Sequence, residues 1–345
     1  MVLVTGGTGL VGAHLLLHLV ENEDSIRAIY RQSTTIKKTK FLFQLHQKEH
    51  LFSKIEWVVA DITDVPSLEI AFQNIDYVYH CAGLISFDPD DEEKLRKVNI
   101  EGTANIVNFC LAYQIKKLCH ISSIAAFGNV ASSEIPIDEE TEWNPEAYHS
   151  DYAISKYGAE MEVWRAQQEG LQVVMVNPGV ILGSTIWHEC SGAIFTKVKN
   201  GLKFYTLGET GYVGVNDVVS IMIQLMKSEI IGERFCLVSE NISYQKIINT
   251  IAQNLNTRGG AERSGAKPKP NFYARPWMTA ILWRIDWFLN TFFRTKRKLS
   301  KHAATAIHTL DKYDNRKIKN PEFSRLNFEF QSIDSVIKEV ISQQK

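Results

Sequence analysis

Short apolar runs alternate with amphipathic stretches from residue 1 to about residue 180 of the chain. Runs such as MVLVT, SIRAIY and IEWVVA have the length and composition of buried strands, whereas LVGAHLLLHLV repeats its apolar residues at helical spacing. Further strands are predicted at DYVYHC, KLCHIS and LQVVMVNP, and further helices at SLEIAF, at EEKLRKVNIEGTANIVNFCLAY and around Tyr152. This alternation predicts an α/β fold with a parallel, doubly wound sheet and right-handed crossovers.

The later part of the chain mixes helical patterns with turn-rich segments. We expect residues 1–180 to form the part built on the parallel sheet, with residues 212–240 returning to it. Residues 181–211 and 241–345 are expected to form a smaller substrate-binding lobe. Ligands of doubly wound folds bind beyond the carboxyl ends of the strands, so the candidate site residues should lie there.

The motif TGGTGLVG follows the first predicted strand directly and opens the first helix. Gly6, Gly9 and Gly12 form a GxxGxxG pattern. Such a turn lets the backbone approach a pyrophosphate, and the helix N-terminus supplies N–H donors and a positive dipole. The position of the motif at the first strand–helix junction predicts a dinucleotide site, although TGYVG at 210–214 partly resembles it without that context.

The second predicted strand ends in IRAIYR, which places Arg31 where a site for NAD usually carries Asp or Glu. Gln32 and Ser33 follow it. A guanidinium can bind a 2′-phosphate through two hydrogen bonds, which favours NADP as the cofactor. NAD stays open as the alternative, because an arginine in a surface loop is common.

Three tyrosines are each followed by a lysine four positions later: Tyr113 with Lys117, Tyr152 with Lys156, and Tyr313 with Lys317. At that spacing an ammonium can lie near the phenol and lower its pKa, which normally lies near ~10. Spacing alone does not choose among the pairs. Only Tyr152 begins a helix that follows a strand end and its loop, which places it on the cofactor side of the sheet.

Seven motifs in order make the chain resemble the extended short-chain dehydrogenase/reductase superfamily, and especially its dihydroflavonol-reductase-like and 3β-hydroxysteroid-dehydrogenase-like branch. The resemblance covers residues 1–240 well and the rest loosely. It implies a Rossmann fold and an NAD(P)-dependent enzyme. The motifs are TGGTGLVG, ADITD, HCAG, VNIEGT, ISSIAAFG, YAISK and NPGVILG.

The resemblance also implies a role for individual residues. Tyr152 would be the general acid/base, Lys156 would lower its pKa and bind the nicotinamide ribose, and Ser123 would hydrogen-bond the substrate oxygen. Asn99 and His80 are expected to be structural. The implied cofactor contacts besides Tyr152, Lys156 and Arg31 are Gly6, Thr8, Gly9, Leu10, Val11, Gly12, Asp61, Ile62, Cys81, Ala82, Gly83, Pro178, Gly179 and Val180.

Two reaction classes remain open. One is a reductase or dehydrogenase that releases its product and exchanges NADP, reducing a ketone or aldehyde or oxidising a secondary alcohol. The other is a nucleotide-sugar epimerase or dehydratase that retains NAD. The first is favoured because epimerases usually carry an acidic residue at Arg31 and an Arg-Asp pair where this chain has Gly211, Tyr212 and Val213.

Composition limits the remaining function classes. The formal net charge of −1 gives no reason to expect a nucleic-acid partner. The cysteines are five in number and form no CxxC pair, and no metal site is expected. A strand begins at once in MVLVTGG, which leaves no room for a signal peptide, and we expect a cytoplasmic protein.

The predicted lobe is rich in aromatic residues, and we favour packing in the lobe core as the explanation over an apolar, ring-shaped or lipid-like substrate. The segment 276–302 combines an aromatic helix with a basic run and is interpreted as a lid helix in preference to a membrane-surface helix. A homodimer is expected through apolar positions of the helices at 92–113 and 152–169, among them Ile106, Phe109, Met161 and Trp164. The aromatic residues are Trp187, Phe195, Phe204, Tyr205, Trp277, Trp283, Trp287, Phe288 and Phe292.

Overall fold

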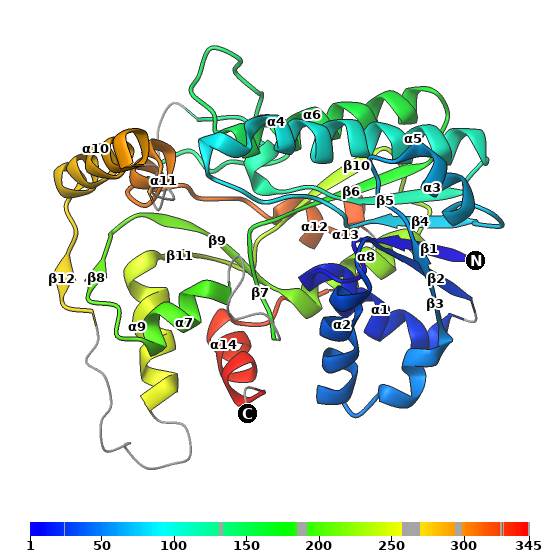
Figure 1. The fold of residues 1–345 in the computed structure, drawn as a ribbon, viewed down its shortest axis with the longest axis horizontal. Coiled ribbons are helices and arrows are strands. Elements are labelled where there is room, and N and C mark those ends of the chain that lie inside the picture. Colours follow the sequence, from blue (N-terminus) through cyan, green and yellow to red (C-terminus); the bar gives the residue numbers. More distant parts are fainter. Residues whose placement is uncertain are drawn as a thin grey trace.

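A seven-stranded parallel sheet with helices on both faces forms the larger part of the computed structural model (Figure 1). The structure describes residues 1–23, 25–130, 134–184, 192–256, 270–293, 299–324, 326 and 328–343. The strand order is β3-β2-β1-β4-β5-β6-β10. The chain adds β2 and β3 on one side of β1 and then places β4, β5, β6 and β10 on the other side, which is the predicted doubly wound architecture. The strands are β1 (Val2–Thr5), β2 (Ile26–Tyr30), β3 (Ile55–Val59), β4 (Tyr77–His80), β5 (Lys117–Ile121), β6 (Val173–Pro178) and β10 (Glu233–Leu237).

Two apolar clusters, one on each face, hold the helices to this sheet. Leu15, Leu16 and Leu19 of the first helix are almost completely buried, as expected for an amphipathic helix packed on a sheet. One face is covered by α1 (Leu10–Asn22), α2 (Ser33–Leu45) and α8 (Val215–Lys227), and the other by α3 (Val65–Ala71), α4 (Glu92–Leu95), α5 (Gly102–Ala112) and α6 (Asp151–Gln168).

The long helix predicted over 92–113 is interrupted. A π-helical turn, Arg96–Glu101, separates α4 from α5. Within this turn Asn99 donates to the carbonyl of Leu84 at 2.9 Å and to Ser155 Oγ at 2.9 Å, and its Oδ1 accepts the N–H of Leu84 at 2.7 Å. The wider turn accommodates a buried side chain that ties the loop after β4 to α6.

A smaller lobe is built on two short sheets. Residues 215–237 belong to the large sheet, through α8 and β10, whereas the segments on either side of them lie in the lobe. The predicted division of the chain into a dinucleotide-binding part and a substrate lobe stays a prediction. The lobe elements are β7 (Val180–Leu182), β8 (Phe204–Tyr205), β9 (Glu209–Gly214), β11 (Glu240–Ser243), β12 (Phe272–Tyr273), α7 (Ala193–Lys199), α9 (Tyr244–Asn256), α10 (Pro276–Phe293), α11 (Lys301–Ala306) and α14 (Ile333–Ser342). The short helices α12 (Arg316–Lys319) and α13 (Pro321–Ser324) lie beside β10 of the large sheet, where Ile318 packs in an apolar cluster.

Two expectations about apolar side chains are wrong. Ile106 is fully buried in the core of the subunit, so it is not free for a dimer contact. Phe195 packs in the lobe core as expected, but Trp277, Phe288 and Phe292 are exposed. Trp187 lies outside the described residues. No described helix has both the length and the apolar content needed to cross a membrane.

Candidate active site

The turn between β1 and α1 has the geometry expected of an anion-binding loop. Gly6 has a φ of 67°, and a Cβ placed there would lie 2.6 Å from the N atom of Ala82, so only glycine lets the loops after β1 and β4 touch. Gly9 begins α1 without a side-chain cap. The N–H groups of the first turn, from Leu10 to Gly12, therefore point out of the helix without intrahelical acceptors. This cradle fits a pyrophosphate.

A buried network fixes the second loop of that cradle. Thr5 Oγ1 accepts the N–H groups of Cys81 and Ala82, each at 3.1 Å. Its proton is therefore donated to His80 Nδ1 at 2.7 Å, and His80 Nε2 donates to Thr103 Oγ1 at 3.0 Å. Burial lowers the pKa of His80 to about 3, so the ring stays neutral. His80 is structural, and it holds the backbone of 81–83 against the glycine turn.

Arg31 lies at the other end of the expected cofactor site. Together with Gln32 and Ser33 it lines an open cavity of about 560 Å³ at the carboxyl ends of β2 and β3. The guanidinium is mostly exposed, and its Nη1 lies 3.9 Å from Asp61 Oδ2. Asp61 Oδ1 accepts the N–H and the hydroxyl of Thr63, both at 2.9 Å, so the carboxylate is held in place. Ile62 is buried.

Tyr152 and Lys156 lie on the first turns of α6, which Ser150 caps by accepting the N–H of Ala153 at 3.1 Å. Tyr152 is 9% exposed and lines a cavity of about 150 Å³, where its ring meets Phe87 edge-on at 5.6 Å. Lys156 is buried, and its Nζ donates to the carbonyl of Ile121 at 2.8 Å. Burial lowers the pKa of this ammonium to about 8, against an opposing influence from Glu160.

Ser123 is the second residue after β5, which ends at Ile121. The carbonyl of Ile121 is the group that accepts the hydrogen bond of Lys156 Nζ. Its hydroxyl accepts the N–H of Ala125 at 3.2 Å, and its carbonyl accepts Asn177 Nδ2 at 3.0 Å. The structure thus brings Ser123 and Lys156 to one end of β5. Ser122, the neighbouring candidate, is buried.

A buried ion pair anchors α6 behind these residues. Glu160 Oε2 lies 2.9 Å from Arg234 Nη1 on β10, and Glu160 Oε1 accepts Asn177 Nδ2 at 2.5 Å. Because the same amide group also donates to Ser123, one side chain couples the Ser123 loop to α6. No local sequence pattern identified this network, since its members are distant in the chain.

The remaining predicted contacts lie at the carboxyl end of β6. Pro178 ends that strand, Gly179 donates its N–H to the carbonyl of Leu237 at 3.1 Å, and Val180 begins β7. A Cβ on Gly179 would strike the backbone of Gly211. The segment is therefore held between the two sheets, at the edge where the loops after β1, β4 and β5 also end.

The other tyrosine–lysine pairs are held in structural contacts. Tyr113 donates to Glu69 Oε1 at 2.7 Å, whereas Lys117 donates to the carbonyls of Leu225 and Ser228 at the opposite end of β5 from Ser123. Burial raises the pKa of Tyr313 far above its ordinary value. Lys317 pairs with Glu233 at 2.7 Å.

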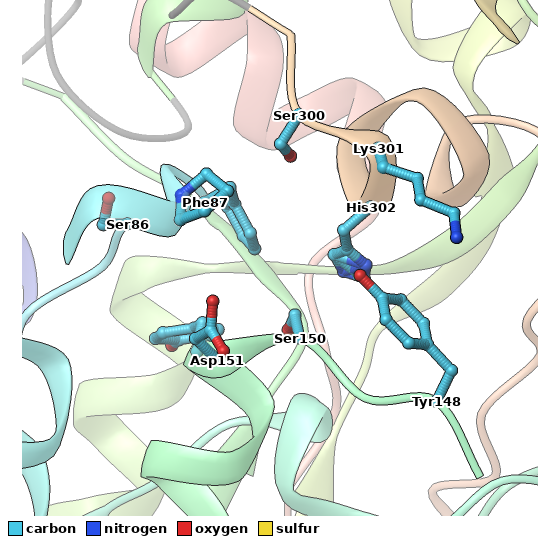
Figure 2. A pocket seen from close by; sticks show the side chains of 10 residues that line it. Ser86, Phe87, Tyr148, Ser150, Asp151, Ser300, Lys301 and His302 are labelled. Carbon is cyan, nitrogen blue, oxygen red and sulfur yellow. The ribbon is translucent and has the colours of Figure 1, made fainter. Parts of the chain in front are cut away.

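The cavity at Tyr152 has a wall from the C-terminal lobe that sequence patterns did not reveal. Lys301 and His302 of α11 line it beside Tyr148 and across from Phe87, and the Asp151 carboxylate points into the space between the two sides (Figure 2). The His302 ring lies 6.0 Å from that of Phe87 and 6.2 Å from that of Tyr148. Burial raises the pKa of Asp151. The lining of the cavity combines the rings of Phe87, Tyr148, Tyr152 and His302 with serine hydroxyls and the charged groups of Asp151 and Lys301.

Comparisons with known proteins agree with this geometry. A putative dihydroflavonol 4-reductase of Synechocystis sp. is 32% identical over 251 residues, which span 71% of this chain and 69% of the relative. Anthocyanidin reductase of Arabidopsis thaliana is 27% identical over 72% of this chain and 79% of the relative. Sterol demethylase protein B of Methylococcus capsulatus is 25% identical over 73% of each chain.

Solved structures share the fold across the whole chain. The protein gox2253 has a TM-score of 0.78 at 22% identity, covering 99% of this chain and 97% of that chain. UDP-glucose 4-epimerase of Thermotoga maritima, solved with UDP-glucose, has a TM-score of 0.74 at 19% identity with the same coverage. Yeast methylglyoxal/isovaleraldehyde reductase Gre2, solved with NADPH, has a TM-score of 0.72 at 19% identity, again covering 99% and 97%.

The family model described as the NAD dependent epimerase/dehydratase family matches residues 2–235. Together with the glycine turn, the Tyr152–Lys156 helix and the reductase relatives, that match identifies the protein class. The chain belongs to the NAD dependent epimerase/dehydratase family and is an NAD(P)-dependent oxidoreductase of the extended short-chain dehydrogenase/reductase type.

Proposed function

We propose that the protein uses NADP(H) to reduce a ketone or aldehyde, or to oxidise a secondary alcohol, on an apolar small molecule. The observation that carries the proposal is the position of Tyr152, which lines an aromatic cavity one helical turn from the buried ammonium of Lys156. Phe87, Tyr148 and His302 give that cavity aromatic surfaces on which an apolar part of the substrate can pack, beside the polar groups that would orient it.

In this proposal a carbonyl oxygen is held between Ser123 and Tyr152. The bound dinucleotide supplies the hydride. Tyr152 donates its phenolic proton to the oxygen as negative charge develops there, and the ammonium of Lys156 stabilises the resulting phenolate. Ser123 donates a hydrogen bond to the same oxygen. In the oxidation direction the phenolate of Tyr152 removes the proton of the alcohol.

The preference for NADP rests on Arg31. Its guanidinium lines an open cavity, and β2 has no acidic residue at its end to hold a ribose 2′-hydroxyl. Its ion-pair partner Asp61 is 3.9 Å away and leaves most of the guanidinium exposed. A 2′-phosphate in this cavity would gain a charge-assisted contact.

The test replaces each tyrosine of the three pairs by phenylalanine. Tyr152→Phe should lower turnover by about a hundredfold or more, while calorimetry finds NADPH binding nearly unchanged, because only the phenolic proton is lost. Tyr113→Phe and Tyr313→Phe are the matched controls and should retain near-native rates. Turnover is followed by NADPH absorbance with a panel of ketones and aldehydes. A native rate in Tyr152→Phe would overturn the proposed mechanism.

The alternative is a nucleotide-sugar epimerase or dehydratase, which would retain NAD and return the hydride to the same substrate. Against it stand Arg31 and the sequence Gly211–Tyr212–Val213 in β9, where epimerases usually carry an Arg-Asp pair. Denaturing the purified protein and identifying any released nucleotide separates the two. A nucleotide-free protein that oxidises NADPH only with a ketone supports the reductase, and stoichiometric NAD with activity on a nucleotide sugar supports the epimerase.

A further inference from the structure

Helix α10 presents an apolar face to the solvent at the end of the smaller lobe (Figure 1). Thr279 is its only buried residue, and Phe292 and Phe293 are 64% and 67% exposed. With 100° between successive residues, eight of the exposed apolar residues fall within one arc of about 160°, whereas the exposed Trp287 lies outside that arc. The exposed apolar members of this face are Trp277, Ile281, Leu282, Ile285, Phe288, Leu289, Phe292 and Phe293.

Two polar side chains of α10, those of Thr279 and Asp286, face the protein instead. Thr279 Oγ1 lies 2.9 Å from His308 Nε2 and donates toward the carbonyl of Ala304 at 3.2 Å. Asp286 Oδ2 accepts the N–H of Leu299 at 3.2 Å. This arrangement reverses the usual one, in which the apolar side of a helix packs on the core. A contiguous exposed apolar face of this kind marks an interaction surface.

The charged residues on and after α10 indicate which kind of partner its apolar face binds. The sequence that follows the helix contains Arg294, Lys296, Arg297 and Lys298 without an acidic residue. On the described helix the exposed charge is that of Arg284, which lies over the ring of Trp283 at 4.6 Å, whereas Asp286 is turned inward. A helix with exposed Trp, Phe and Leu beside basic residues is the pattern of a segment lying on an anionic membrane.

We propose that α10 binds the surface of a lipid bilayer that contains anionic lipids. The helix lies parallel to the surface, with its apolar face inserted at the boundary between headgroups and acyl chains, because no described helix is suited to span the bilayer. The proposal takes the membrane-surface alternative of the sequence analysis in place of the lid helix. The proposal concerns binding alone and does not depend on the proposed reaction.

Vesicle flotation tests the proposal with the full-length protein. The native protein should float with vesicles of phosphatidylcholine and phosphatidylglycerol, float far less with phosphatidylcholine alone, and lose binding as salt is added. The triple variant Ile281→Gln/Phe288→Gln/Phe292→Gln should lower partitioning by about tenfold or more, because each side chain contributes apolar area to the bilayer. Its thermal unfolding midpoint should stay near the native value, since all three side chains are exposed.

A matched control removes the same side-chain types elsewhere. Phe41→Gln/Ile70→Gln/Phe323→Gln also replaces one isoleucine and two phenylalanines, each about half exposed, on α2, α3 and α13. Flotation of this variant should be native. If both triple variants lost binding to the same extent, the assignment to α10 would be wrong.

A second measurement uses tryptophan fluorescence instead of flotation. Brominated phosphatidylglycerol should quench part of the tryptophan fluorescence of the native protein, and Trp277→Phe should remove a measurable share of that quenching, because Trp277 is 59% exposed on the proposed contact face. Light scattering tests the alternative that a second copy of this chain covers the apolar face of α10. A native dimer that the α10 triple variant dissociates, together with no vesicle binding and no quenching, would overturn the proposal in favour of a second copy of this chain.

Discussion

Replacing Glu160 by glutamine tests whether a buried charge behind the cavity tunes the ammonium of Lys156. The two side chains are four positions apart on α6, so they lie one helical turn apart, on the order of 6 Å. Glu160 raises the pKa of Lys156 against the larger effect of burial, which lowers it to about 8. In Glu160→Gln the opposing influence is lost, and the pKa of Lys156 should fall further.

The size of the effect follows from the distances. Two unit charges about 6 Å apart attract with roughly 3 kcal/mol at an effective dielectric constant of about 20, equivalent to about 2 pKa units. Arg234, 2.9 Å from the carboxylate, cancels part of that attraction, so we expect a fall of about 1 pKa unit. The variant should also lose about 3 kcal/mol of stability, because Arg234 loses its buried partner.

The assay is kcat/KM for ketone reduction across neutral and alkaline pH. The proposed proton transfer needs the charged form of Lys156. The alkaline limb of the kcat/KM profile should therefore move to lower pH in Glu160→Gln. Glu162→Gln is the control, since it removes the same charge from the same helix at a site paired with Arg165 at 3.0 Å. The reasoning is refuted if Glu160→Gln is destabilised but keeps the native alkaline limb.

Two further predictions concern the cofactor and stability. Arg31→Ala should narrow the preference for NADPH over NADH by about 1–2 kcal/mol, measured by calorimetry, and equal or tighter NADH binding to the native protein would contradict the cofactor assignment. His14 and His80 are buried with pKa values lowered to about 4 and 3, so below pH 6.5 the unfolded state takes up protons that the native state does not. This difference lowers the free energy of unfolding by about 4 kcal/mol between pH 7 and pH 5. Asp217, whose pKa is raised to about 6, takes up a proton in the native state over the same range and raises the free energy of unfolding by about 1 kcal/mol. Urea unfolding should therefore give a lower free energy of unfolding at pH 5 than at pH 7, by about 3 kcal/mol from these three groups, and buried His120, whose pKa is also lowered, adds to the loss. Equal values at both pH values would show that these rings are not held neutral.

The parallel sheet and its helices could be predicted because their signals are local. Each strand is a short apolar run, and each helix repeats its apolar residues at the helical period. The glycine turn and the helix of Tyr152 and Lys156 were equally accessible, because both sit directly after a predicted strand. The expectation that Tyr152 lies at the cofactor edge, and Tyr113 and Tyr313 do not, needed only the rule that strand ends on one edge of a parallel sheet meet. That Tyr152 is the catalytic tyrosine stays a prediction.

The network of Glu160, Asn177 and Arg234 could not be predicted, because its members come from α6, β6 and β10. The π-helical turn at Arg96–Glu101 was missed for a related reason, since the partners of Asn99 are in a loop and in α6. Ile106 was misplaced because apolar spacing does not reveal how much of a helix its own subunit covers.

The exposure of the aromatic side chains of helix α10 could not be predicted for a different reason. Its sequence is apolar on most sides, so periodicity does not show which face packs on the protein. Only the hydrogen bonds of Thr279 and Asp286 reveal that the polar side is the packed one. The basic residues that follow were visible in the sequence, but their meaning depends on that orientation.

The proposed reaction and the proposed membrane contact meet at α11. This helix packs against α10 through the contact of Ala304 with Thr279, and it lines the cavity at Tyr152 through His302. A bilayer that holds α10 would therefore place the aromatic cavity close to the lipid surface. An apolar ketone that partitions into lipid would then reach Tyr152 from a phase where its concentration is far higher than in water. The two proposals can fail separately, since flotation needs no turnover and the Tyr152→Phe assay needs no vesicles. If both hold, anionic vesicles should lower the apparent KM for a lipid-soluble ketone in the native protein but not in the α10 triple variant.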